Sequence, residues 1–244
     1  MEGADRATAS VVAIVQARMS STRLPGKVLA DLGPGTTLEV LVRRLGSASS
    51  LHAIVLATST DPSDDPVAEA AAGLGMELVR GPLEDVLGRY ELAASAHGAD
   101  AVVRITADCP LVDAALVDRM VEMWRKGEAD YVCNTIEPRT FPKGLDVEVV
   151  SRGALQAAAA RATDPYDREH VTPYIRARPD EFPQLPLYMT PDLGEMRLTL
   201  DTEEDLDILR DTLGRIGEAA DLRSILATHG FDPHVVEILD ARPD

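Results

Sequence analysis

The sequence predicts an α/β fold in which helices cover both faces of a doubly wound, mostly parallel sheet. Apolar runs alternate with amphipathic segments over about the first 130 residues, and these runs are short, continuous and rich in β-branched residues. Such runs are typical of strands buried on both faces, and helical crossovers between them make the strands parallel. We expect strands at residues 11–17, 53–58, 76–79 and 101–106, and helices at 38–45, 65–75, 84–97 and 113–126.

Capping residues indicate where these helices begin and end. Thr36 and Glu39 have the spacing of a capping box before the first helix. Asp65 can cap the second helix with Pro66 at its first position, and Gly98 can end the third. The expected helices therefore carry local signals for their ends.

The pattern changes after residue 130, where prolines become frequent. We interpret residues 130–195 as an inserted lobe on the one sheet, within a single domain of residues 11–244, and residues 1–10 as a flexible tail. Here we expect strands at 131–134, 145–150 and 196–201, helices at 151–162 and 168–176, a helix capped by Thr202, and two short helices at the end.

Composition excludes several classes of protein. The chain has 244 residues and a formal net charge of −17, so its field repels nucleic acids and anionic membranes. Aromatic residues make up only 4%, too few for base-stacking platforms. Cys109 and Cys133 form neither a disulfide framework nor a metal-binding spacing, and no apolar run is long enough to span a bilayer. No signal-peptide pattern opens the chain, so we expect a cytoplasmic protein that binds neither nucleic acid nor membrane.

A basic loop follows directly after the first expected strand. It holds Arg18, Arg23 and Lys27 together with three hydroxyl residues, in a chain that is otherwise strongly acidic. Fixed positive charge at the carboxyl end of a buried strand suits a polyanion such as a nucleotide triphosphate. The loop matches neither the Walker A motif nor the dinucleotide fingerprint. The alternative is that these are surface residues of a long loop.

Two carboxylates are expected at the same edge of the sheet. Asp108 follows the strand at 101–106, and Asp201 ends the strand expected at 196–201. Carboxylates beside a phosphate site repel the phosphate unless a divalent cation lies between them, and Mg²⁺ binds one or two carboxylates plus phosphate oxygens. Taken singly, Asp108 suits a turn before Pro110, and Asp201 suits a helix cap. Together with the basic loop they favour a magnesium site.

Five segments resemble the cytidylyltransferase family, whose members activate sugar acids with CTP. They run in family order across nearly the whole chain and are most similar to the SpsF-like spore-coat polysaccharide branch. The segments are residues 17–27 (ARMSSTRLPGK), 104–111 (RITADCPL), 141–148 (FPKGLDVE), 167–174 (DREHVTPY) and 197–206 (RLTLDTEEDL).

The resemblance implies a Rossmann-like nucleotidyltransferase fold, with Mg²⁺ as cofactor. The implied reaction transfers CMP from CTP to an acidic sugar or related small anionic acceptor and releases pyrophosphate. It also implies a homodimer formed through the lobe at 130–195. Transfer of this kind depends on positioning and on neutralising phosphoryl charge, so cations are the expected machinery. The implied catalytic residues are Arg18, Lys27, Asp108 and Asp201; the nucleotide-binding residues are Gln16 and Ala17 through their backbones, Arg18, Arg23, Lys27, Arg104 and Asp108; the metal ligands are Asp108 and Asp201; and the acceptor-binding residues are Lys143, Asp146, Glu148, Arg168 and His170.

Two other functions remain as alternatives. A glycosyltransferase on a related sheet would need an Asp-x-Asp motif at a strand end, but residues 205–207 (DLD) fall within an expected helix. A non-catalytic nucleotide-binding protein would bind CTP without needing either aspartate. His170 also has two interpretations, contact with a bound acid or a structural histidine.

Overall fold

The computed structural model describes residues 6–240 of the chain. The strands are β1 (Val11–Gln16), β2 (Ala53–Ser59), β3 (Glu77–Gly81), β4 (Ala101–Thr106), β5 (Tyr131–Cys133), β6 (Glu148–Ser151), β7 (Gln184–Pro186), β8 (Tyr188–Thr190) and β9 (Glu237–Leu239). The α-helices are α1 (Thr37–Leu45), α2 (Asp65–Gly73), α3 (Val86–Ala96), α4 (Ala114–Arg125), α5 (Arg152–Arg161), α6 (Pro165–His170), α7 (Pro173–Arg176), α8 (Glu203–Ile216) and α9 (Leu222–Thr228). Short 3-10 helices span Arg6–Thr8, Lys27–Leu29, Pro62–Asp64 and Pro233–Val235.

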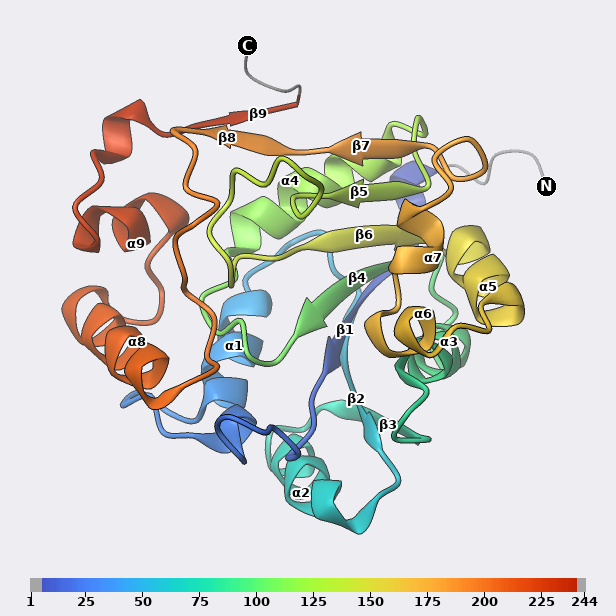
Figure 1. Cartoon of the computed structure of the whole chain (residues 1–244), viewed down its shortest axis with the longest axis horizontal. Coiled ribbons are helices and arrows are strands. Elements are labelled where there is room, and N and C mark those ends of the chain that lie inside the picture. The colour runs from blue at the N-terminus through green and yellow to red at the C-terminus, as the bar shows by residue number, and fades with distance from the viewer. Residues whose placement is uncertain (1–5, 241–244) are drawn as a thin grey trace.

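A seven-stranded sheet in the order β3-β2-β1-β4-β6-β5-β7 runs through the molecule (Figure 1). Strand β6 is antiparallel to both of its neighbours, and the other pairs in this sheet are parallel. The α/β prediction of a doubly wound, mostly parallel sheet is confirmed.

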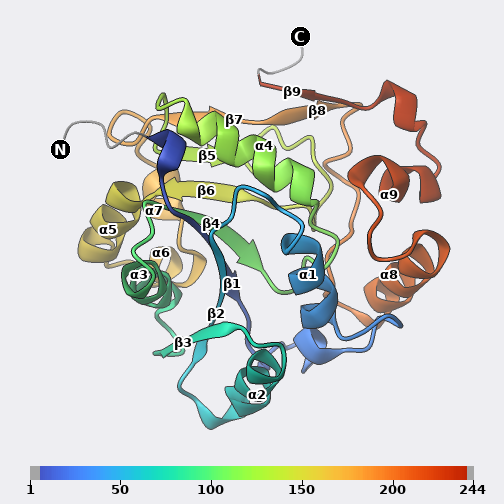
Figure 2. The ribbon, with the colours of Figure 1, turned by 180° about the vertical axis from the view of Figure 1, so that it is seen from behind.

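The centre of the sheet is buried on both faces. The first five residues of β1 are fully buried, and the strand pairs with β2 on one side and β4 on the other. Helices α1 and α4 lie over the face seen in Figure 2, whereas α6 and α7 lie on the face seen in Figure 1. Because Gln16 pairs with Thr106, the carboxyl ends of β1 and β4 lie side by side. The loops that follow these two strands therefore meet at one edge of the sheet.

The expected helix caps are largely present. Thr36 and Glu39 form both bonds of a capping box at α1, and Thr202 forms one with Asp205 at α8. The cap of α2 differs by one residue, because Asp64 occupies the N-cap position and Asp65 begins the helix. Capping signals in the sequence thus locate helix starts to within about a residue.

The strand expected at residues 196–201 is not formed. Leu198 N donates to Lys143 O at 2.6 Å and Leu200 N donates to Asp108 O at 2.8 Å, so the extended segment bonds to two different loops. Leu198 and Leu200 are buried, which explains the strand-like alternation of the sequence. The segment crosses the end of the sheet instead of joining it.

Other differences concern elements that the sequence pattern did not resolve. The helix expected at 168–176 is two helices, α6 and α7, because the backbone turns sharply at Val171, which has a φ of 73°. Strands β7, β8 and β9 were not expected. Each has only three residues, too few to show a period.

The flexible tail predicted for residues 1–10 is described only in part, since residues 1–5 lie outside the described range. In the described part, the Arg6 guanidinium lies 4.7 Å from the centre of the Trp124 ring. It donates to Trp124 O at 3.0 Å and to Ala129 O at 2.7 Å. Arg6 is therefore bound to α4 and to the loop that follows it, and the flexibility of the tail stays a prediction.

The segment at residues 130–195 supplies β5, β6 and β7 to the central sheet. Its last strand, β8, pairs with β9 in a separate antiparallel ladder. Whether this segment also forms a dimer contact stays a prediction. Among residues 6–240, no helix combines the length and apolar character needed to span a membrane.

Candidate active site

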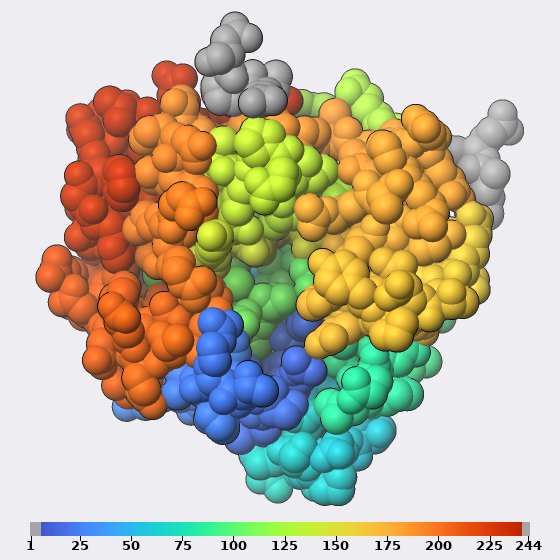
Figure 3. All heavy atoms as spheres, in the orientation of Figure 1, coloured from blue at the N-terminus to red at the C-terminus, as the bar shows by residue number. Residues whose placement is uncertain are grey.

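A pocket of about 490 Å³ opens where the carboxyl ends of β1 and β4 meet. Figure 3 shows it as a hollow between the N-terminal loop in blue, the green residues that follow β4, and the yellow and orange segments of the C-terminal half. Six cationic side chains and four carboxylates line it, so the pocket is locally cationic although the chain carries a net charge of −17. The predicted site residues that line it are Gln16, Ala17, Arg18, Arg23, Lys27, Arg104, Asp108, Lys143, Asp146, His170 and Asp201.

The basic loop reaches the pocket because it folds back on itself. Gly26 N donates to Met19 O at 3.0 Å, and Gly26 adopts a left-handed φ of 73°, which glycine tolerates better than other residues. Met19 N donates to the buried Asp64 carboxylate at 2.7 Å, which anchors the start of the loop to the segment that follows β2. The three cations of the loop therefore line the same pocket.

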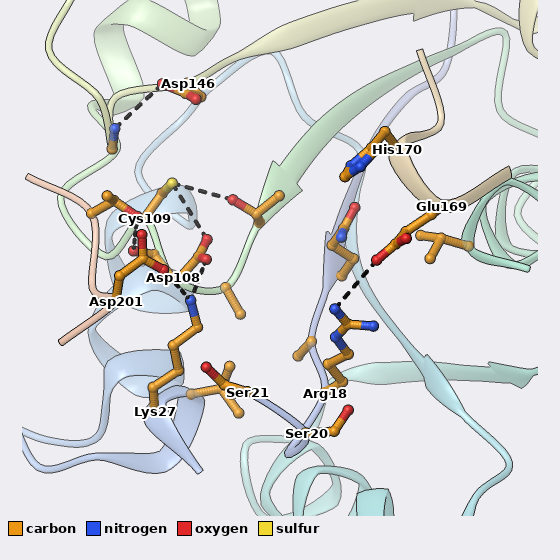
Figure 4. Close-up of a pocket in the computed structure, with 18 of the residues that line it drawn as sticks. Arg18, Ser20, Ser21, Lys27, Asp108, Cys109, Asp146, Glu169, His170 and Asp201 are labelled. Carbon is orange, nitrogen blue, oxygen red and sulfur yellow. Dashed lines mark hydrogen bonds and ion pairs between the residues drawn. The ribbon is translucent and has the colours of Figure 1, made fainter. Parts of the chain in front are cut away.

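The Lys27 ammonium lies between the two predicted metal-binding carboxylates (Figure 4). Its Nζ is 2.6 Å from Asp108 Oδ2 and 2.8 Å from Asp201 Oδ1. The Lys27 side chain is only 12% exposed. The two carboxylates thus converge on the Lys27 ammonium, and that they bind a metal ion stays a prediction.

The charges in this cluster stabilise each other. Burial by itself would lower the pKa of Lys27, but attraction to Asp108 and Asp201 and hydrogen bonds with them outweigh it and raise that pKa. Burial would raise the pKa of Asp201, but its bonds to Lys27 and Arg197 and the charge of Arg23 lower it. Both groups are therefore charged at neutral pH.

The second oxygen of Asp201 is also bound by cations. Asp201 Oδ2 lies 2.9 Å from Arg23 Nη2 and 3.1 Å from Arg197 Nη2. Arg197 also contacts Asp205, whose carboxylate accepts from the backbone N–H groups of Asp201 and Thr202. The start of α8 therefore holds Asp201 in one orientation.

A tight backbone contact brings the Asp201 segment against the rest of the pocket. Gly144 has a φ of 106°, and a Cβ at this position would lie 2.4 Å from the carbonyl carbon of Leu198. Thr199 Oγ1 donates to Asp108 O at 3.2 Å, in addition to the bond from Leu200 N. Glycine at 144 therefore permits the approach that places both aspartates in one site.

On the opposite side of the pocket, Arg18 points toward Glu169 (Figure 4). Arg18 Nη2 is 3.4 Å from Glu169 Oε1, and the two side chains are about half exposed, at 46% and 48%. Glu169 belongs to α6 and immediately precedes His170, which also lines the pocket. The basic loop is thus paired with carboxylates at both ends.

Comparison with known proteins decides the family. A model of the cytidylyltransferase family matches residues 12–225, which is most of the chain. The chain belongs to the cytidylyltransferase family.

Individual relatives support this assignment. The chain is 31% identical to the spore coat polysaccharide biosynthesis protein SpsF of Bacillus subtilis over 244 residues, covering 96% of this chain and 95% of SpsF. It is 32% identical to the 3-deoxy-manno-octulosonate cytidylyltransferase of Solibacter usitatus over 176 residues, covering 68% of each chain. The structure of a cytidylyltransferase from Leptospira borgpetersenii superposes with a TM-score of 0.87 at 29% identity, covering 97% of this chain and 99% of the other. This protein is therefore a nucleotidyltransferase with the α/β fold of that family.

Two of the acceptor-binding residues expected in this cytidylyltransferase do not line the pocket. Glu148 is 3% exposed; its Oε1 lies 2.5 Å from Arg104 Nη1, and its Oε2 accepts from the Tyr131 hydroxyl. Arg168 donates to Asp85 at 2.5 Å. Both residues belong to segments that contribute other side chains to the pocket. The Glu148 carboxylate is instead buried behind the lining residue Arg104, and Arg168 is bound to Asp85, which does not line the cavity.

The remaining acceptor candidates do line the pocket, in different environments. Asp146 is paired with Arg139, a residue that the sequence analysis did not identify. Lys143 is 40% exposed, and its nearest carboxylate is Glu195 at 3.9 Å. His170 is exposed and contacts the Tyr166 ring edge-on at a centroid distance of 4.4 Å. This exposure favours a contact role for His170 over a structural one.

Several lining residues were missed by the sequence analysis. They are the hydroxyl residues of the basic loop, Glu169 and Arg89. Ser20, Ser21 and Thr22 were noted only as members of the basic loop. Their position among the three cations of that loop could have placed them in the pocket. Arg89 lies inside α3 and Glu169 inside α6. The sequence of a helix does not show whether a single charged side chain faces a pocket or the solvent.

The thiol of Cys109, which lines the cavity, is not activated as a nucleophile. Cys109 is buried, and burial raises its pKa well above the ordinary thiol value. A thiol held in that form is a poor nucleophile. Cys109 therefore packs next to Asp108 as a protonated thiol.

Proposed function

We propose that this protein transfers CMP from CTP to a small anionic acceptor, an acidic sugar or a related compound, and releases pyrophosphate. The observation that carries the proposal is the convergence of Arg23, Lys27, Asp108 and Asp201 in one pocket at the end of β1 and β4. Positive charge suits a triphosphate, and the two carboxylates suit the cation that accompanies it.

The transfer would proceed by attack of an acceptor oxygen on the α-phosphorus of CTP. The new bond joins that oxygen to phosphorus, and the bond between the α-phosphorus and the bridging oxygen breaks. Pyrophosphate leaves, and the acceptor hydroxyl gives up its proton to water. Arg18, Arg23 and Lys27 would neutralise the negative charge of the phosphates as it shifts to the leaving group. The enzyme therefore contributes position and charge, without a covalent intermediate.

The donor set fits Mg²⁺ as cofactor. Within residues 6–240 no group of three or more His, Cys, Asp or Glu side chains is arranged for a metal, so an all-protein cage is not formed. Two carboxylates, Asp108 and Asp201, already converge on one cation, which matches the sparse protein ligation typical of Mg²⁺ with phosphate. When bound there, Mg²⁺ would screen the phosphate charge and orient the triphosphate.

The acceptor would lie on the side of Lys143 and His170. Among residues 6–240, the Lys143 ammonium has no ion-pair partner closer than Glu195 at 3.9 Å, which leaves it able to bind an anion. An acidic acceptor is supported by the similarity to an enzyme named for 3-deoxy-manno-octulosonate. We also propose that the enzyme acts in the cytoplasm as a homodimer, as the family resemblance implies.

A glycosyltransferase is disfavoured by the positions of the only Asp-x-Asp aspartates found in the sequence. Asp205 caps α8 and Asp207 is an exposed residue of the same helix, 3.7 Å from Arg210. Asp207 does not line the pocket.

The experiment is an assay of pyrophosphate release with CTP, Mg²⁺ and a panel of acidic sugars. We expect release with at least one acidic sugar, and loss of release in Asp201→Asn but not in Asp207→Asn. Absence of CTP binding by calorimetry, with no release from any acceptor, would overturn the proposal. Transfer from a nucleotide sugar without use of CTP would favour the glycosyltransferase.

A further inference from the structure

Each cation of the basic loop is bound to a carboxylate from another segment of the pocket. Lys27 contacts Asp108 and Asp201, and Arg23 contacts Asp201. Arg18 contacts Glu169 instead, on the far side of the cavity (Figure 4). The two aspartates would bind a metal ion under the proposed function, whereas Glu169 lies away from both of them and has no such role.

Glu169 is held in place by the turn that follows it. Thr172 N donates to His170 O at 2.8 Å, which closes a three-residue turn around Val171. Val171 has a φ of 73° and a ψ of −56°, the strained form of the γ-turn, and it is β-branched and fully buried. Strain of this kind persists where the surrounding structure enforces it and gathers at functional sites.

A second contact fixes the other side of the same helix. Arg168 donates to Asp85 at 2.5 Å and to Ala159 O at 2.7 Å, which joins α6 to the start of α3 and to α5. The Glu169 carboxylate is therefore presented to Arg18 by a segment anchored on both sides. A surface carboxylate that met Arg18 by chance would need neither anchor.

We propose that Glu169 is a positioning residue that competes with the nucleotide phosphates for Arg18. This inference rests on the proposed function. A guanidinium binds phosphate through paired N–H donors, so a phosphate that reaches Arg18 takes over the donors that contact Glu169. The carboxylate that is released lies next to His170, so nucleotide binding also changes the charge on the acceptor side of the pocket.

The effect should be modest, because the pair is half exposed. An exposed ion pair at this distance contributes a factor of about 1.4–5 to an equilibrium. Glu169→Gln should therefore tighten nucleotide binding by about 1.4- to fivefold. In the Arg18→Gln background the same substitution should leave the affinity unchanged, because the group it competes for is absent.

The test is calorimetric titration with CTP and Mg²⁺, without acceptor, on the wild type, Glu169→Gln, Arg18→Gln and the double variant. Glu181→Gln is the matched control, since Glu181 is a 40%-exposed partner of Arg161 outside the pocket. It removes the same charge and should leave the affinity at the wild-type value. Thermal unfolding of each variant checks that the fold is retained.

Unchanged or weaker binding by Glu169→Gln would overturn the inference. An equal gain in the Arg18→Gln background would also overturn it, because the effect would then not act through Arg18. Titration with inorganic tripolyphosphate separates the two proposals. A wild-type chain that binds tripolyphosphate but not CTP contradicts the proposed function. In that case the affinities of Glu169→Gln and the wild type for tripolyphosphate still decide the inference. A chain that binds neither contradicts both.

Discussion

Substitution of Glu148 distinguishes a structural role from the substrate-binding role that the sequence predicted. Glu148 on β6 is directly opposite Arg104 on β4 in the antiparallel register, and the side chains are 5% and 13% exposed. Glu148→Gln keeps the shape but removes the charge, which leaves the Arg104 guanidinium buried without a counterion. Breaking a buried pair in this way costs about 3 kcal/mol or more. For a domain of this size, Tm should fall by about 6–12 °C.

The pH dependence of this loss has a defined sign. Burial would raise the pKa of Glu148, but the charge of Arg104 and the Tyr131 hydrogen bond outweigh it and lower that pKa below the ordinary value of 4.5. A carboxyl group with a depressed folded pKa stabilises the protein above its unfolded pKa, and this contribution is lost as the pH falls through the folded value. The stability difference between the wild type and Glu148→Gln should therefore be constant near neutral pH and shrink below about pH 4.

Thermal unfolding followed by circular dichroism measures both effects. Glu218→Gln is the control, because Glu218 forms an exposed pair with Arg43 at 2.8 Å, and its loss should cost at most about 1 kcal/mol. A loss under about 1 kcal/mol for Glu148→Gln would refute the reasoning. If Glu148→Gln raised the KM for the acceptor and left the stability unchanged, Glu148 would have the substrate-binding role after all.

Three further predictions concern the pocket itself. Asp108→Ala and Asp201→Ala should each lower turnover by about 100-fold or more, measured as pyrophosphate release, with an unchanged circular dichroism spectrum; wild-type rates would contradict the metal assignment. Lys27→Met frees two carboxylates of their ammonium, so added Mg²⁺ should raise Tm further than in the wild type, by about 2–4 °C for each kcal/mol of extra binding. An equal or smaller Mg²⁺ shift would mean that lysine and metal do not share a site. Gly144→Ala should cost about 1–3 kcal/mol in thermal unfolding, because a Cβ meets Leu198 at 2.4 Å, whereas Gly153→Ala in α5, where nothing lies within 4 Å, should stabilise by about 0.4–1 kcal/mol. Equal effects of the two alanines would contradict the close approach.

The parts of the fold that the sequence predicted well depend on local signals. The β-branched run of β1 and the capping box of α1 each lie within a few residues, and both appear in the structure as expected. The meeting of the basic loop and Asp108 was also predictable, because parallel strands end at the same edge. No long-range information is needed for these steps.

The features that the sequence did not predict correctly depend on contacts between residues far apart in the chain. Leu198 and Leu200 alternate like strand residues, and only the hydrogen bonds to Lys143 and Asp108 show that this segment crosses the end of the sheet. Glu148 and Arg168 belong to segments near the pocket, but whether a side chain faces the cavity depends on the partner it meets on a neighbouring strand or helix. Glu169 was missed for the same reason, since its partner Arg18 is 151 residues away.

The ion pairs of the pocket join the two halves of the chain as well as organising the site. Lys27 and Asp201 are 174 residues apart, and Arg18 and Glu169 are 151 apart, so these contacts close long loops between the first strand and the C-terminal half. A ligand that takes over one of these cations removes a contact between the two halves and replaces it with contacts to itself. Binding and stability are therefore coupled here, since a nucleotide bound to the folded chain stabilises it in proportion to RT ln(1 + [L]/Kd). It follows that a substitution in this pocket can alter the stability of the free enzyme and the affinity for the nucleotide in opposite directions, and that the two have to be measured separately before a role in catalysis is assigned.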